Sequence, residues 1–334
     1  MLISRFVILK HLLRPWRKFK QHLIATSTNS IRPSSYDIVQ PWLFQDPSPW
    51  VNIQTVPSHI RAPSYGDGTP VGQHKKQTDL HNPERLAGIR RSCQLARKTL
   101  EYVGKHVKPG VSTADLDNVA FEFIVKHNAY PSPLNYSGYP KSICTSVNNV
   151  ACHGIPDSRQ LIAGDIVNVD VTVFLGGYHG DCSKTFPVGE IDEKAEKLLH
   201  ITELALRNAI SICRNGQSMS EIGEIIEKTA SDHGYSVIPF FCGHGIGEDF
   251  HMLPDVIHRA NIDETIMETG MVFTIEPVVS EGSDKITILE DGWTAISVDN
   301  SRSAQFEETI LIKEDCAEIL TVAHDTIEIA DLSR

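Results

Sequence analysis

A short apolar phrase that ends in a carboxylate occurs twice in this chain. Residues 164–170 read GDIVNVD, and residues 270–276 read GMVFTIE. The same offset in sequence relates residues 110–116 to residues 216–222. Two matches at one offset indicate two related half-domains, each with a carboxylate at the end of a buried strand. Because a buried carboxylate is costly unless it is paired or bound to metal, the pattern predicts a metalloenzyme whose site is shared between the halves.

The first of these carboxylates, Asp170, lies in a segment whose side chains alternate between apolar and polar. Gly176 and Gly177 are the turn signal of a two-residue hairpin, and a hairpin centred there pairs Thr172 with Asp181. This register places Asp170 and Asp181 diagonally on one polar face, with Cβ atoms about 7–8 Å apart. The two carboxylates can then converge on one cation or on a pair. A solvated hairpin face would explain Asp181 alone, but Asp170 is embedded in an apolar strand.

Further candidate ligands lie in the second half of the chain. His244 is part of the run GHGIG at residues 243–247, where glycines let the imidazole approach a site closely. This run lacks the strand–turn–helix unit and the acidic partner that a dinucleotide loop needs. Glu276 closes an apolar strand. A later strand contains two neighbouring glutamates, Glu307 and Glu308, and the pattern of residues does not choose between them.

The elements that must position these residues repeat in the same order. Asn82 precedes a proline, which predicts a helix start, and Ser112 or Thr113 can cap a second helix. The predicted elements are helices over about 83–104 and 113–124, strands within 142–188, helices over about 192–214 and 219–233, and strands within 236–322. The order of two helices followed by strands occurs twice, and this repeat predicts an α+β domain with pseudo-twofold symmetry.

Composition and charge exclude several classes of protein. A net charge of −11 argues against nucleic acid as the main partner. No apolar run approaches the roughly 20 residues that a transmembrane helix needs. Seven cysteines, an odd number without a CxxC pair, indicate reduced thiols in a reducing compartment.

The N-terminal region differs from the rest of the chain. Residues 1–36 contain seven Lys and Arg residues, no acid, and apolar residues at helical spacing. This composition is typical of a mitochondrial targeting presequence; the alternatives are a membrane-surface helix or a basic tail. Residues 37–80 are rich in proline and show little periodicity, which predicts an extended arm.

Five spaced motifs agree, in order, with one known family. They are CHGIP at 152–156, Asp170 with Asp181, GHGIG at 243–247, TIEP at 274–277 and SAQFE at 303–307. In these motifs the chain resembles type I methionine aminopeptidase, over about residues 80–325. The resemblance implies a catalytic domain at 81–334 with the "pita-bread" fold, in which two related helix–helix–strand halves surround a curved antiparallel sheet. The run YPKS at 139–142 and the basic leader are most similar to the mitochondrial form.

The resemblance also implies a dinuclear metal centre and its catalytic residues. The implied metal ligands are Asp170, Asp181, His244, Glu276 and Glu307, with Asp181 and Glu307 bridging two divalent ions. Such a mainly hard donor set is compatible with Co, Mn, Fe or Zn. Glu276 would also act as general base, while His251 contacts the scissile carbonyl oxygen and His153 the side of the amide nitrogen.

The substrate site follows from the same resemblance. The implied lining of the methionine pocket is Tyr136, Tyr139, Cys144, Phe250 and Trp293, together with His153 and His251. Pro133 and Ser137 stand where bacterial relatives often have cysteine and histidine, which changes the fine shape of the pocket. A backbone site for one monovalent cation is implied at Asn148, Val150 and Ser303.

The implied substrates are the N-termini of nascent or deformylated polypeptides with a small second residue, in the mitochondrial matrix. We expect the protein to be a monomer that does not bind nucleic acid and has no transmembrane segment. The alternatives are a prolidase or Xaa-Pro aminopeptidase on the same fold, a type II enzyme with a helical insertion, and a catalytically dead binding module. The short arm and the CHGIP motif favour the type I enzyme over a prolidase, and the full ligand set favours it over a binding module. The chain before His244 and between Glu276 and Glu307 has no room for the insertion of a type II enzyme.

Overall fold

The computed structural model describes residues 36–40, 53–71 and 82–322. The predicted presequence, residues 1–36, lies outside these ranges except for Tyr36. Within the described residues no helix is both long enough and apolar enough to cross a membrane.

The first half of the fold consists of two helices packed on a long hairpin. Helix α3 (Pro83–Gly104) begins after Asn82, whose side chain accepts hydrogen bonds from two backbone N–H groups of the first turn. Helix α4 (Thr113–Lys126) has a capping box between Ser112 and Asp115, so Ser112 rather than Thr113 is the cap. Strands β4 (Ile166–Leu175) and β5 (Tyr178–Pro187) form the hairpin, and α3 packs against both.

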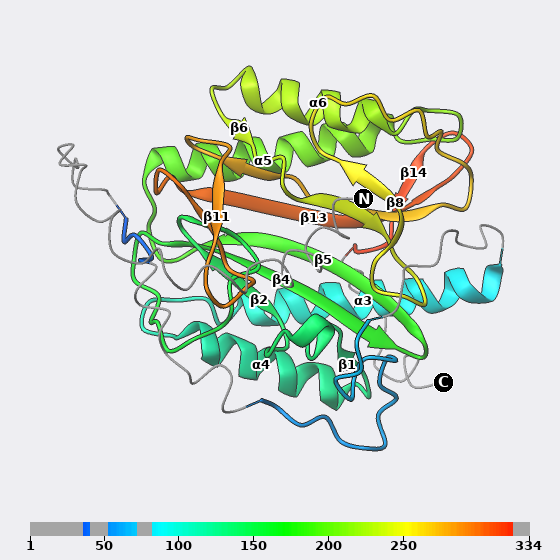
Figure 1. Cartoon of the computed structure of the whole chain (residues 1–334), viewed down its shortest axis with the longest axis horizontal. Coiled ribbons are helices and arrows are strands. Elements are labelled where there is room, and N and C mark those ends of the chain that lie inside the picture. Colours follow the sequence, from blue (N-terminus) through cyan, green and yellow to red (C-terminus); the bar gives the residue numbers. More distant parts are fainter. Residues whose placement is uncertain (1–35, 41–52, 72–81, 323–334) are drawn as a thin grey trace, which may run out of the picture.

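The second half repeats this arrangement. Helix α5 (Glu193–Ile212), capped by Asp192, and helix α6 (Ser220–Ser231) pack on each other. Their strands are β7 (Cys242–Gly245), β8 (Met252–Ile257), β9 (Val272–Ile275) and β13 (Ser303–Ile312). In Figure 1, α5 and α6 lie along one side of the molecule and α3 and α4 along the other, with β4, β5 and β13 between them. The predicted α+β domain with two related halves is therefore confirmed.

Antiparallel pairing joins the two halves in one sheet. Its main strand order is β1 (Tyr130–Pro131), β4, β5, β13, β9, β7, β8. The shorter members of this sheet are β2 (Cys144–Val147), β6 (Ser236–Val237), β10 (Val278–Ser280) and β14 (Ala317–Ile319), and β3 (Val150–Cys152), β11 (Ile286–Ile288) and β12 (Ala295–Ser297) form a second sheet. Pairing of β13 with both β5 and β9 is the junction between the halves.

Each half has its own apolar core. The valines of β4, from Val167 to Val173, are fully buried against the helices of the first half. In the second half, Phe273 and Ile310 belong to a core formed with α5 and α6.

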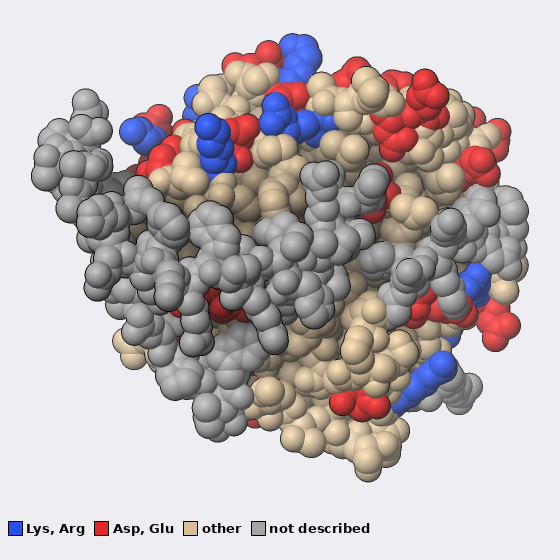
Figure 2. Space-filling model, viewed as in Figure 1, with Lys and Arg blue, Asp and Glu red and all other residues tan. Residues whose placement is uncertain are grey.

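Acidic side chains gather near α6 and β8 at the upper right of the face in Figure 2, in keeping with the net charge of −11.

The β4–β5 hairpin has the register that the sequence predicts. Thr172 pairs with Asp181 and Asp170 with Ser183, and Gly176 and Gly177 have φ of 62° and 102°, values that favour glycine. Gly180 lets α3 approach closely, because a Cβ there would lie 2.2 Å from the backbone N of Cys93. The helix thus supports β5 directly beside Asp181.

The arm contacts the folded core at two places. Residues 36–40 are tied to the turn after β2: Asn149 Oδ1 accepts from Val39 N at 2.8 Å, and its amide donates to Val39 O at 3.0 Å. Residues 53–71, coloured blue in Figure 1, run beside α4 and β1, and Ile60 is buried with Leu134 and Phe174. Between 53 and 71 the arm contains turns but no helix or strand, and it forms part of the packed molecule.

Candidate metal centre

Five adjacent strands each contribute one candidate ligand. Asp170 lies on β4, Asp181 on β5, Glu307 on β13 and His244 on β7, and Glu276 directly follows β9. Because these strands are neighbours in the order β4, β5, β13, β9, β7, residues up to 137 positions apart in the sequence (170 to 307) meet on the sheet.

The ligand atoms of this group converge. One ligand atom each of Asp181, His244 and Glu307 lies within 4.8 Å of the others. His244 Nε2 is 3.8 Å from Asp181 Oδ2 and 3.6 Å from Glu276 Oε1. Asp181, His244, Glu276 and Glu307 are all less than 9% exposed. The cluster has the carboxylate and imidazole donors that a divalent metal requires, held in a buried site.

Burial and mutual repulsion disfavour charge on these acids when no cation is present. Burial raises the pKa of Asp170 to about 7. The pKa values of Asp181 and Glu276 are raised well above the ordinary range, mainly by burial and secondly by the negative charge of Asp170. The pKa of Glu307 is also raised well above the ordinary range, mainly by burial and secondly by the negative charges of Asp181 and Glu276. Divalent cations would offset this repulsion, so the residues present fit a metal site.

Neighbouring groups orient two of the candidate ligands. Glu276 Oε1 accepts a hydrogen bond from Thr274 Oγ1 at 3.0 Å, and its Oε2 accepts from Gln305 Nε2 at 3.2 Å. His244 Nδ1 lies 3.1 Å from the carbonyl oxygen of Gly245. When Nδ1 carries the proton and donates it there, Nε2 is left with a lone pair facing Asp181 and Glu276.

Several of these supporting residues were not predicted from the sequence. Gln305 and Thr274 each lie two positions before a candidate ligand, and strand alternation could have identified them. His258 accepts a hydrogen bond from the backbone N–H of Glu276 at 3.1 Å through Nε2, and burial lowers its pKa to about 3. No local pattern marks His258, because its contact depends on the pairing of distant segments.

Of the two histidines expected to contact substrate, His251 lies beside the cluster and His153 lies among aromatic residues, one of them the pocket residue Trp293. The His251 ring is 4.1 Å from that of His244 between centroids. His153 follows β3 with φ of 55° and lies edge-on to Phe241 and Trp293. Burial lowers the pKa of His153 to about 4, so its imidazole is neutral at pH 7.

The predicted pocket residues also come together. Tyr139, Cys144 and Trp293 form one buried apolar cluster, against which Tyr136 packs. The Tyr139 and Trp293 rings are 5.1 Å apart, and the Tyr136 and Phe250 rings 4.8 Å. An aromatic and thiol-lined surface therefore adjoins the metal cluster through the contact between Phe250 and His251, 4.3 Å apart.

The residues of the expected monovalent cation site are also neighbours. Asn148 has φ of 51°, and its carbonyl accepts a hydrogen bond from Ser303 N at 2.9 Å. Val150 is buried on β3, two residues further along. The structure thus joins Asn148, in the turn before β3, to Ser303 at the start of β13.

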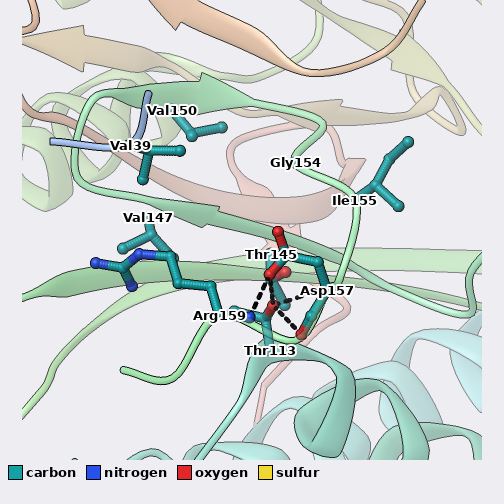
Figure 3. A pocket seen from close by; sticks show the side chains of 9 residues that line it. All are labelled: Val39, Thr113, Thr145, Val147, Val150, Gly154, Ile155, Asp157 and Arg159. Atoms are coloured by element: carbon teal, nitrogen blue, oxygen red, sulfur yellow. Dashed lines mark hydrogen bonds between the residues drawn. The ribbon is translucent and has the colours of Figure 1, made fainter. Parts of the chain in front are cut away.

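A small cavity lies elsewhere in the first half. It measures about 20 Å³ and is bounded by Val39, β2, β3 and residues 154–159, as Figure 3 shows. Thr113 and Asp157 are hydrogen-bonded on its polar side at 3.1 Å. It has room for about one water molecule, and none of the candidate metal ligands lines it, so it is a packing feature rather than a substrate site.

Comparison with known proteins gives one consistent result. Metallopeptidase family M24 matches residues 87–314. "Methionine aminopeptidase 1D, mitochondrial" of Danio rerio is 46% identical over 306 residues, which cover 92% of this chain and 85% of that protein. Its namesake in Homo sapiens is 47% identical over 290 residues, covering 87% and 85%.

Solved structures agree with these sequence relatives. A methionine aminopeptidase from Rickettsia prowazekii has a TM-score of 0.72 and 42% identity, and the match covers 74% of this chain and all of that one. A prolidase from Pyrococcus furiosus has a TM-score of 0.60 at 22% identity, covering 73% and 66%. The second likeness concerns the fold alone.

Proposed function

Because the chain belongs to metallopeptidase family M24, we propose that its buried cluster is the active site of a methionine aminopeptidase. The enzyme removes the initiator methionine from polypeptides whose second residue is small. The observation that carries this proposal is the convergence of Asp181, His244, Glu276 and Glu307, with Asp170 on the adjoining strand. The names and identities of the relatives supply the substrate class.

In this proposal two divalent metal ions occupy the cluster. The residues that would hold them are Asp170, Asp181, His244, Glu276 and Glu307. The donor set suits Co, Mn, Fe or Zn. When bound, such ions would activate water at neutral pH and would polarise the scissile carbonyl.

The protein's own groups then move the proton and orient the substrate. Glu276 accepts the proton of the attacking water, and its carboxylate is already oriented by Thr274 and Gln305. His251, beside His244, donates to the carbonyl oxygen as charge develops there. His153, neutral at pH 7, faces the amide nitrogen that leaves.

The aromatic surface beside the cluster accepts the methionine side chain. Tyr136, Tyr139, Cys144, Phe250 and Trp293 offer an apolar lining with one thiol, which suits a flexible thioether. Placing the substrate's free α-amino group at the metal end fixes cleavage after the first residue only. The monovalent cation at Asn148, Val150 and Ser303 would hold the turn that leads into β3.

The site of action follows from the relatives named mitochondrial and from the basic leader. Residues 1–36 act as the presequence, 37–80 as the arm and 81–334 as the catalytic domain. The enzyme works as a monomer in the matrix. Its substrates are nascent polypeptides made there, after the formyl group has been removed, because only a free α-amino group can reach the metal.

Peptide hydrolysis tests the proposal directly. The purified protein, supplied in turn with Mn, Co, Fe or Zn, should release methionine from Met-Ala-Ser and Met-Gly peptides and should cut Met-Arg and Met-Leu peptides poorly. A chelator should stop the reaction, and one metal should restore it. Preferential cleavage of Xaa-Pro peptides would instead show a prolidase.

A further inference from the structure

We propose that Tyr65, on the arm, is a positioning residue for the methionine pocket. Tyr65 lies outside the segment that matches the family, residues 87–314, yet only 4% of it is exposed. The Tyr65 ring packs against the Tyr136 ring, and it also stacks on His179, which in turn stacks on Phe250. This inference rests on the proposed function and deepens it, since it concerns how the first residue of the substrate is selected.

The contact between Tyr65 and Tyr136 is specific in geometry. The two ring centroids are 5.0 Å apart and the ring planes meet at 80°, the edge-to-face arrangement that aromatic pairs favour. The Tyr65 hydroxyl donates a hydrogen bond to the carbonyl oxygen of Ser132 at 2.8 Å. The ring is therefore fixed at both its edge and its polar end.

A second path runs from Tyr65 to Phe250. The His179 ring stacks between them, 6.3 Å from Tyr65 and 5.4 Å from Phe250, with interplanar angles of 16° and 12°. His179 Nδ1 is 2.8 Å from the hydroxyl oxygen of Ser132. Ser132 thus contacts both Tyr65 and His179, and the four residues form one packed unit behind the pocket.

The turn that carries Tyr136 needs support from outside. On either side of Tyr136, Asn135 and Ser137 have φ of 67° and 48°, in the left-handed region that non-glycine residues rarely adopt. Such conformations persist only where the surroundings hold them in place. The backbone hydrogen bonds of the short helix η2 (Tyr136–Gly138), such as Gly138 N to Asn135 O at 3.1 Å and Tyr139 N to Tyr136 O at 2.9 Å, hold its main chain but do not fix the Tyr136 ring.

The arm supplies that support. Gly66 O accepts a hydrogen bond from the side-chain amide of Asn135 at 2.8 Å, and Tyr65 packs on the next residue, Tyr136. The arm is itself anchored by Ile60, buried with Leu134 and Phe174. The pocket wall is therefore completed by a segment that precedes the catalytic domain in sequence.

Loss of the Tyr65 ring should loosen substrate binding without changing the chemistry. Without that ring the Tyr136 side chain can turn away, and the thioether loses part of its packing. We expect Tyr65→Leu to raise KM for a Met-Ala-Ser peptide about tenfold, the scale of one lost aromatic pair, with kcat within about twofold. Discrimination between methionine and leucine as first residue should fall by a similar factor.

The experiment compares three variants of the full chain. Tyr65→Phe keeps the ring and should recover most of the wild-type KM. Ile226→Ala truncates a fully buried side chain of α6, in the core of the other half of the fold, and should lower the melting temperature while leaving KM unchanged. If Tyr65→Leu does not fold, Tyr65→Met fills the same space with a flexible side chain and is expected to show the same rise in KM.

Each outcome decides between the alternatives. A raised KM in Tyr65→Leu, rescued by Tyr65→Phe and absent in Ile226→Ala, supports the inference. An unchanged KM in folded Tyr65→Leu, or an equal rise in Ile226→Ala, overturns it and leaves the proposed function intact. A wild-type protein that does not cleave Met-Ala-Ser with any of the metals overturns the proposed function, and the inference with it.

Discussion

Glu307 and Glu308 are neighbours on β13, but their side chains lie on opposite faces of the sheet. Glu307 joins Asp181 and His244 in the buried cluster. Glu308 instead pairs with Arg97 of α3 and accepts a hydrogen bond from Thr321. Strand alternation requires this separation, and the pairing of Glu308 with Ile275 of β9 sets which of the two faces the cluster.

The first prediction compares these two glutamates. Glu307→Gln should abolish most activity, because an amide is a weaker metal ligand than a carboxylate. Glu308→Gln should leave kcat/KM nearly unchanged but lower the free energy of unfolding by about 1–3 kcal/mol, since it weakens a charge-assisted hydrogen bond to Arg97. Peptide assays at saturating metal and denaturant unfolding measure both. A severe loss of activity in Glu308→Gln with a mild one in Glu307→Gln would show that the register is wrong.

The second prediction concerns Glu276. Glu276→Gln should lower kcat by a factor on the order of 10²–10⁴, the usual contribution of a general base, with a further loss from weaker metal binding. Metal content measured alongside kcat separates the two effects. Gln305→Ala removes the Nε2 donor to Glu276 and the Oε1 acceptor for Cys152 Sγ but leaves the Glu276 carboxylate in place, so this matched control should be milder. Equal activity of Glu276→Gln and wild type would exclude Glu276 as the base.

The third prediction concerns the metal-free protein and pH. Asp170 has a folded pKa of about 7 because of burial, above its unfolded value of about 3.9. A raised folded pKa means that its contribution to stability is complete below about pH 4 and is lost as pH rises through about 7. The contribution of Asp170 to the stability of the chelated protein should therefore fall over this range.

Divalent metal should reverse that trend. Binding to the folded state stabilises it by mass action, while protons compete with metal for the carboxylates. Adding Mn should raise the melting temperature at pH 7 and have much less effect near pH 5. The Asp170→Asn variant, which lacks one titrating carboxylate, should show a flatter pH dependence without metal. Identical pH dependence of stability in the chelated wild type and the chelated Asp170→Asn variant would contradict this account.

The fourth prediction tests the leader. Residues 1–36 fused to a fluorescent protein should direct it to mitochondria, because a basic segment without acids suits import across an energised membrane. Replacing Arg14, Arg17 and Lys18 by glutamine in the same fusion should weaken import. Diffuse cytosolic fluorescence of the unaltered fusion would rule out this role.

The sequence by itself determined the local parts of this protein. The two-glycine turn and the alternation around Asp170 predicted the hairpin register, and Asn82 predicted where the first helix begins. These features depend on residues close in sequence, where turn geometry and side-chain periodicity act directly. The repeat of one phrase also predicted two related halves, and the family resemblance selected the ligand candidates.

Only the tertiary structure decided how distant segments meet. The strand order that brings Asp181, Glu307 and Glu276 together depends on long-range pairing across the junction of β13. The support of Glu276 by His258 and of Tyr136 by Tyr65 likewise joins segments with no shared local pattern. Such contacts are fixed by the packing of the whole core, because a side chain's partner across a sheet is set by register and burial rather than by its sequence neighbours.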